Sequence, residues 1–157
     1  MILVAAAGNA PGDTAVISPA NIRGVIGVTG IGTDGAFWSG SVQGRGAVLS
    51  APADAIYTTA PLAISSYGYQ KSDGTSDATA FVSGVAALIR AKYPDMDANN
   101  VIYRMIKTAT DKGEKGWDGQ YGDGVINPVA ALTADIPTVD RNPLLPKEGE
   151  AGGGANQ

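Results

Sequence analysis

The chain has 157 residues, of which 44% are hydrophobic and 17% charged, as expected for one globular domain with a sizeable core. Its net charge of −4 argues against nucleic acid and an anionic membrane surface as partners. It contains no cysteine, which excludes disulfides, and no histidine. No run approaches the roughly 18–20 apolar residues of a membrane span. Met1–Asn9 lacks the charged n-region of a signal peptide.

Three apolar runs in the first third of the chain predict buried strands. They are Ile2–Ala7, Val25–Ile31 and Gly46–Pro52. The first run ends in Gly8-Asn9, which taken alone is an ordinary turn, because both residues tolerate left-handed backbone dihedrals.

The stretch from Gly74 to Arg90 predicts a helix that begins at Ser76, after a polar loop. Its apolar residues recur every three or four positions and indicate one face directed to the core: Phe81, Val82, Val85, Leu88 and Ile89. The N-terminus of such a helix carries unpaired N–H groups and a partial positive charge, which favours negative charge nearby. On this geometry alone, Ser76 or Thr75 is most simply an N-cap.

A second helix is predicted beyond Tyr93-Pro94, because proline disfavours helical backbone in the residue before it. Asp95 or Asp97 can cap this helix, and Lys112-Gly113 ends it. Its apolar face comprises Val101, Ile102, Met105, Ile106 and Ala109.

The last predicted helix is short and ends at Leu132, with Asn127 as N-cap and Pro128 as first residue. The acidic, glycine-rich segment 117–124 before it matches no calcium-loop spacing, so a solvated turn is the better interpretation. From Ile136 onward proline and glycine replace apolar periodicity. The sequence therefore predicts one domain over residues 1–134 and a flexible linker or tail over residues 135–157.

Two motifs give this chain a family resemblance. Gly74-Thr75-Ser76-x-Ala78 resembles the nucleophile segment of the subtilisin-like serine proteases, or subtilases, although Ala80 replaces the usual proline and Phe81 a frequent histidine. Ala6-Ala7-Gly8-Asn9 resembles the A-A-G-N segment of the same family. Asn9 precedes Ser76 by 67 residues, in the order and at the distance expected for that family.

The resemblance implies a fold and a site. The fold would be α/β, a subtilisin-like three-layer arrangement with a mostly parallel sheet, present here as its C-terminal half. Residues 36–41 would form a short strand, and residues 56–69 a hairpin leading to the nucleophile. Ser76 would be the nucleophile and Asn9 an oxyanion-hole donor. Substrate would be held by Ala5, Ala6, Ala7, Gly8 and Thr75, with no metal or cofactor.

The family's general base is a histidine that lies upstream of the A-A-G-N strand, together with its aspartate. Because this chain has no histidine, we expect a serine endopeptidase segment that is inactive alone. Its partners would be a polypeptide substrate and a complementary N-terminal half supplying the missing Asp and His. The edge of the Ile2–Ala7 strand would otherwise favour self-association.

Three alternative interpretations of these residues differ from the histidine-dependent protease. Lys71 could act as a base for Ser76, but a loop lysine is usually solvated. A pseudoprotease or peptide-binding scaffold that keeps the cleft without the chemistry stays open. A dinucleotide-binding domain does not, since no G-x-G-x-x-G opens a helix after a strand. The layout of a catalytic domain followed by a proline-rich linker resembles the mycosin-type subtilases of type VII secretion, which implies an extracytoplasmic, cell-envelope location.

Overall fold

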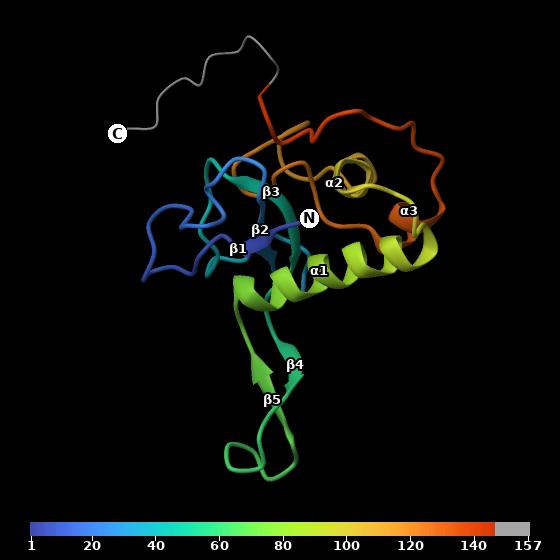
Figure 1. The fold of residues 1–157 in the computed structure, drawn as a ribbon. Helices are drawn as coiled ribbons and strands as arrows, with labels where there is room; N and C mark the ends of the chain where they lie inside the picture. Colours follow the sequence, from blue (N-terminus) through green and yellow to red (C-terminus); the bar gives the residue numbers. More distant parts are fainter. Residues whose placement is uncertain (147–157) are drawn as a thin grey trace.

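The computed structural model describes residues 1–146. Five strands precede three helices along the chain (Figure 1). The strands are β1 (Val4–Ala6), β2 (Ile26–Ile31), β3 (Ala47–Pro52), β4 (Ile56–Thr59) and β5 (Tyr69–Ser72). The helices are α1 (Thr75–Lys92), α2 (Ala98–Lys107) and α3 (Pro128–Thr133). None of the helices in this described part is long and apolar enough to cross a bilayer.

The centre of the fold is a parallel sheet with strand order β1-β2-β3. All six residues of β2 are buried, as expected for the middle strand of a sheet with both faces covered. The backbones of β2 and β3 approach so closely that a Cβ built on Gly27 would lie 2.0 Å from the Gly46 carbonyl oxygen. Glycine is therefore required at position 27. The parallel pairing of the three strands confirms the α/β class with a parallel sheet that the sequence predicts.

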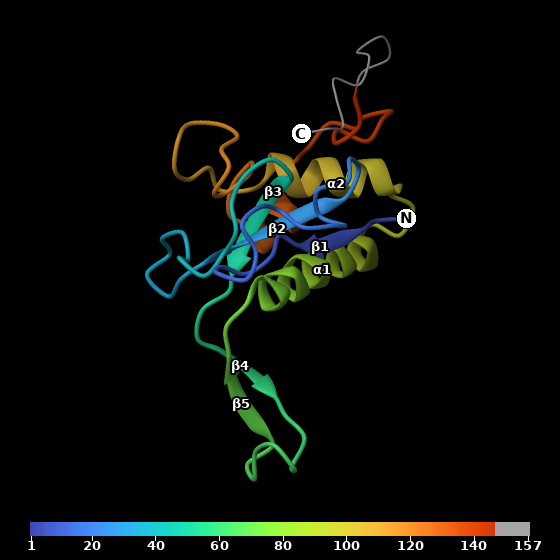
Figure 2. The same cartoon turned by 90° about the vertical axis from the view of Figure 1, so that its left-hand side faces the viewer.

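Helix α1 packs across β1, β2 and β3 with a narrower apolar face than its spacing predicts (Figure 2). Val82, Val85 and Ile89 are buried, together with the small residues Ala78 and Ala86, which allow the helix to lie close to the sheet. The prediction was wrong for Phe81 and Leu88, which are 45% and 52% exposed. These two residues each lie about one turn from Gly84, on opposite sides of it, on the helix surface that no described element covers.

Helix α2 begins as predicted and ends early. Asp97 is its N-cap and accepts a hydrogen bond from the Asn100 N–H at 2.8 Å. The helix ends at Lys107 rather than near Lys112, because Thr110 exchanges two backbone hydrogen bonds with Val125, and this pairing requires extended backbone. Met105 and Val101 lie in the core, as their spacing predicts.

Helix α3 is fastened to the far end of α1. Its N-cap is Asn127, whose side chain accepts from the Ala130 N–H, and Pro128 opens the helix as predicted. At its other end, the Leu132 carbonyl accepts hydrogen bonds from the Tyr93 hydroxyl at 2.8 Å and from Lys92 at 2.6 Å. The buried Arg104 of α2 donates to the carbonyls of Ala131 and Ala134. These contacts join the C-terminal ends of α1 and α3.

The expected strand over residues 36–41 does not form. Phe37 and Ser41 make only isolated bridges, to Ile31 and Asn9 respectively. A turn in which the Ser41 N–H donates to the Trp38 carbonyl bends the chain between them, so no continuous ladder can develop. Phe37 instead packs edge-on against Tyr121, with 6.0 Å between ring centroids.

The expected hairpin before α1 is present: β4 and β5 pair antiparallel and project from the body at the end where α1 begins (Figures 1 and 2). The segment after α3 has no helix or strand as far as Pro146. It nevertheless lies against α2, because the Asn100 amide side chain both donates to and accepts from the backbone of Val139. The rest of the predicted tail, residues 147–157, lies outside the described residues.

Candidate active site

The two motif residues lie at the same end of the sheet. Asn9 follows the carboxyl end of β1, and Ser76 is the second residue of α1. Functional groups of open parallel α/β sheets gather at the carboxyl ends of their strands, where helices begin. The fold therefore brings together two positions that are 67 residues apart in sequence.

The Asn9 side chain has a fixed orientation. Its Oδ1 accepts a hydrogen bond from the backbone N–H of Thr75 at 3.0 Å. Because a backbone N–H can only donate, this bond assigns the amide oxygen to the Thr75 side and turns Nδ2 away from it. Asn9 is exposed, and its Nδ2 has no acceptor among residues 1–146. It is a pre-oriented donor that faces solvent.

The backbone around Asn9 is held by a residue that the motif does not include. Asp13 accepts a hydrogen bond from the Asn9 N–H at 2.9 Å, and its own N–H donates to the Asn9 carbonyl at 3.0 Å. Gly8 has φ +117°, and a Cβ there would lie 2.9 Å from the Asp13 carboxylate. The sequence predicts a turn here, and an Asp four residues after Asn9 in such a turn was the available signal for this contact.

Thr75 is fully buried and connects both motifs. Its hydroxyl lies 3.0 Å from Asn9 Oδ1 and 3.3 Å from both the N–H and the carbonyl of Gly8. The N-cap interpretation of Thr75 and Ser76 is wrong: the N-cap of α1 is Gly74, with no side-chain hydrogen bond. Thr75 lies too deep to cap the helix, because its side chain points into the contact with β1.

Ser76 is exposed in the first turn of α1. Neither its hydroxyl nor its backbone N–H is hydrogen-bonded to another described residue. Because the Thr75 N–H is already bound to Asn9, the Ser76 N–H is the next free donor at the positive end of the helix. Adjacent Cα atoms are about 3.8 Å apart, so this donor and the Asn9 amide lie close together.

The alanines before Gly8 face different sides of β1. Ala5 and Ala7 are buried in a second core cluster with Val16, Ala20, Val25 and Val42. Ala6 points to the opposite face and is half-buried. Of the three alanines, Ala6 is therefore the one with surface available to a ligand.

Among residues 1–146, no basic or acidic side chain is hydrogen-bonded to the Ser76 hydroxyl. The sequence has no histidine, and Lys71 is exposed on β5, opposite Tyr57 in the hairpin. Two carboxyl groups have pKa values shifted from their ordinary value, and neither is adjacent to Ser76 in the sequence. Hydrogen bonds from Asn100 lower the pKa of Asp97, and burial raises the pKa of Asp123. No group of three metal-ligating side chains occurs in the part of the chain that the structure describes.

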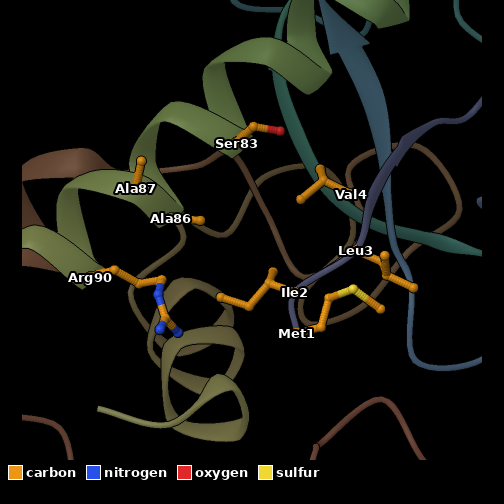
Figure 3. A pocket seen from close by; sticks show the side chains of 8 residues that line it. All are labelled: Met1, Ile2, Leu3, Val4, Ser83, Ala86, Ala87 and Arg90. Atoms are coloured by element: carbon orange, nitrogen blue, oxygen red, sulfur yellow. The ribbon is translucent and has the colours of Figure 1, made fainter. Parts of the chain in front are cut away.

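A groove lies beside the free edge of β1, with a cavity volume of about 570 Å³ (Figure 3). Ile2 and Val4 line it from the β1 segment, and Ser83, Ala87 and Arg90 from α1. Within residues 1–146, no strand pairs with this edge of β1. The surface beside it is partly apolar, since Leu3 is 47% exposed and Met1 is 95% exposed.

Comparison with known proteins agrees with the fold. Residues 1–124 match the Subtilase family. The chain therefore belongs to the subtilase family.

Its relatives include the mycosins. Mycosin-1 of Mycobacterium tuberculosis is 40% identical over 119 residues, which cover 72% of this chain and 26% of Mycosin-1. The crystal structure of MycP1 from the ESX-1 type VII secretion system superposes with a TM-score of 0.77 and 30% identity, covering 92% of this chain and 45% of that one. A chain in the structure of an intact ESX-5 inner membrane complex gives a TM-score of 0.75 and 30% identity, covering 99% and 42% respectively. This chain thus spans less than half of each of these proteins.

Proposed function

We propose that this chain is the nucleophile-bearing part of a serine endopeptidase, with Ser76 as nucleophile. The observation that carries the proposal is the bond between Asn9 Oδ1 and the Thr75 N–H. This bond holds a free amide donor beside the free N–H of the serine at a helix N-terminus. Two such donors are the arrangement that stabilises an oxyanion in acyl transfer.

In the proposed reaction, Ser76 Oγ attacks the carbonyl carbon of a peptide bond and its proton passes to a base. The carbonyl oxygen becomes negatively charged and is held by Asn9 Nδ2 and the Ser76 N–H. The base then returns the proton to the peptide nitrogen, and collapse of the tetrahedral intermediate breaks the C–N bond, releases the amine and leaves an acyl group on Ser76, which water then hydrolyses. Ala6 and Gly8 would line the substrate pocket, and Thr75 would act through Asn9.

The base and its orienting aspartate would come from a complementary N-terminal half. Without a base, Ser76 is a neutral alcohol at pH 7 and a poor nucleophile. We place the complementary half on the free edge of β1 and in the groove lined by Ser83 and Ala87, because an apolar parallel edge requires a covering strand. Without that half, the same edge would favour self-association.

The test is labelling with a fluorophosphonate, which reacts with an activated serine. The chain is assayed alone and fused to the segment encoded upstream or to the upstream half of Mycosin-1, with Ser76→Ala as control. Labelling only in the fused form, and not in Ser76→Ala, would support the proposal. If no form is labelled although the fusion is folded, the chain is instead a peptide-binding scaffold that has lost the chemistry.

A second pair of variants tests where the complementary half docks. Ser83→Arg places a large charged side chain in the groove. Val129→Arg is the control: it adds the same charge on α3, outside the groove, at a position that is 71% exposed. We expect Ser83→Arg to abolish labelling when the two halves are mixed as separate chains, and Val129→Arg to leave it unchanged. Equal labelling of both variants would place the docking surface elsewhere.

We further propose an extracytoplasmic site of action in the cell envelope, in association with a secretion complex. The support is likeness to MycP1, described with the ESX-1 secretion system, and to a chain of an ESX-5 inner membrane complex. Fractionation of cells expressing the tagged protein tests this placement: recovery with the cell envelope would support it, and recovery in the cytoplasm would contradict it.

A further inference from the structure

The β4–β5 hairpin is a projecting, uncovered apolar surface. No residue from 54 to 73 is buried, and five large apolar side chains there are among the most exposed in the described chain. They are Tyr57 (81% exposed), Leu62 (75%), Ile64 (68%), Tyr67 (87%) and Tyr69 (64%). A concentration of exposed apolar side chains in one segment is a feature of interaction sites in soluble proteins.

The outer part of the hairpin, residues 55–70, carries no charged side chain, and Lys71 at its base is the one charged residue of the two strands. Between Asp54 and Lys71 the chain has no Asp, Glu, Lys or Arg, although 17% of all residues are charged. Tyr57 and Tyr69 share one face, because the register pairs Tyr57 with Lys71 and Thr59 with Tyr69. Tyrosine is enriched and charged residues are depleted in the cores of protein interfaces, and residues 55–70 share both properties.

The base of the hairpin is tied to the segment around Ser76. The Ala55 N–H donates to the Asp73 carboxylate at 2.6 Å, and the Gly74 N–H donates to the Ala53 carbonyl at 2.8 Å. The Ser72 hydroxyl donates to the Asp77 carboxylate at 2.8 Å. Residues on both sides of Ser76 therefore fix the hairpin, and anything bound to it is held in a set position relative to the nucleophile.

We infer that the hairpin is an exosite for the polypeptide substrate, which recognises an uncharged apolar segment distant from the scissile bond. This inference rests on the proposed peptidase function. Tyr67 precedes Ser76 by nine residues, and a strand rises about 3.3 Å per residue, so the tip lies up to about 30 Å from Ser76. An extended substrate also rises about 3.3 Å per residue, so at this distance the tip of the hairpin would contact it about eight to ten residues from the cleaved bond.

The charge distribution favours this occupant over a lipid surface. Anionic headgroups attract lysine and arginine, and the hairpin between residues 55 and 70 has none, on a chain of net charge −4. Continuity with the nucleophile segment favours substrate over an unrelated partner, because the hairpin leads directly into α1 and the Ser72 hydroxyl is hydrogen-bonded to Asp77 in the first turn of that helix.

The experiment uses the fused, active protease and its Ser76→Ala form. A short core peptide chosen from a library is compared with the same core carrying a ten-residue extension, rich in Leu and Phe or in Ser and Lys, on either end. The tip variant is Leu62→Ser with Tyr67→Ser. The matched control is Ile22→Ser with Val129→Ser, two positions that are 53% and 71% exposed away from the hairpin.

We expect the apolar extension to raise kcat/KM about tenfold or more, the size of effect of an interface anchor. The tip variant should lose this gain and cleave the core peptide normally, whereas the control should keep it. In the Ser76→Ala form, fluorescence anisotropy should show the same extended peptide binding about tenfold more weakly to the tip variant.

Three results would overturn the exosite: no effect of the extension, equal loss for core and extended peptides in the tip variant, or tip-dependent binding to phosphatidylcholine vesicles without tip-dependent peptide binding. If the wild type cleaves nothing, the proposed peptidase function fails by itself. The anisotropy measurement then still decides whether the hairpin binds an apolar polypeptide.

Discussion

Asn9 and Thr75 are joined twice across the interface between β1 and α1: the Thr75 N–H and the Thr75 hydroxyl each lie 3.0 Å from Asn9 Oδ1. The pair connects the loop after the first strand with the first turn of the helix that carries Ser76. Two contacts to one oxygen leave the amide little rotational freedom. The geometry of the proposed oxyanion site is thus set by a side chain that does not itself reach solvent.

Asn9→Ala should lower kcat of the fused enzyme strongly, with KM nearly unchanged. An oxyanion donor acts on charge that develops in the transition state, and loss of one donor lowers kcat about 10²–10³-fold, a range that comes from subtilisin. Steady-state kinetics on a short peptide provide the measurement. A rise in KM at constant kcat would instead indicate that Asn9 binds ground-state substrate.

Thr75→Val should also lower kcat, because it removes the hydroxyl that holds Asn9 and keeps the shape of the side chain. If Thr75 acts through Asn9, the double variant with Asn9→Ala should lose no more than Asn9→Ala alone. Thr75→Ser keeps the hydroxyl and should restore most of the activity. Additive losses would show that Thr75 acts on the reaction independently.

Asp97→Asn should remove a pH dependence from stability while keeping the cap, since Asn caps helices as well as Asp does. Hydrogen bonds from Asn100 hold the pKa of Asp97 below the ordinary 3.8. A lowered folded-state pKa gives stability that is present above the unfolded-state value and lost as pH falls through the folded-state value. The Tm of the wild type should therefore exceed that of Asp97→Asn at neutral pH and converge with it below pH ~3.8.

Arg104→Ala should destabilise the fold by about 2–4 kcal/mol, because it leaves the carbonyls of Ala131 and Ala134 without their charged donor. Arg104 also lies 4.8 Å from the centre of the Tyr93 ring. Lys107→Ala, on the exposed side of the same helix, makes the same change of charge and should alter stability by about 0.5 kcal/mol or less. Denaturant unfolding of the two fused variants tests the difference.

Asn127→Ala should lower stability by about 1 kcal/mol, the usual loss for an N-cap. The Asn127 side chain accepts the Ala130 N–H at 2.9 Å and also donates to the Thr110 hydroxyl at 3.3 Å. Asn127→Asp keeps the accepting oxygen and should recover most of the loss. A stability equal to that of wild type in Asn127→Ala would mean that water replaces the cap without loss.

Features that depend on neighbouring residues in the sequence could be predicted from the sequence. The three core strands and the capped helices α2 and α3 follow from apolar runs and capping residues. The α/β class and the hairpin follow from the family resemblance. Ser76 and Asn9 follow from motifs. The contacts of Thr75 with Gly8 and Asn9 could not be predicted, since they join residues 66 and 67 positions apart.

The errors have a shared physical origin. The spacing of Phe81 and Leu88 fits a helix face, but a face is buried only if another element covers it. The segment 36–41 has strand-like residues, but its turn at Trp38 breaks the ladder. In both places the outcome depends on neighbours in space that the local pattern does not specify.

Helix α1 is anchored at both ends: Thr75 is bound to Asn9, and Lys92 and Tyr93 are bound to the Leu132 carbonyl. Its 18 residues act as a strut about 27 Å long at 1.5 Å per residue. A rigid strut transmits axial displacement along its whole length. Loss of the hydrogen bonds from Lys92 and Tyr93 to the Leu132 carbonyl would therefore move Ser76 relative to Asn9, although neither residue is changed. In the proposed fused protease, this movement would lower the rate of acylation while the protein stays folded.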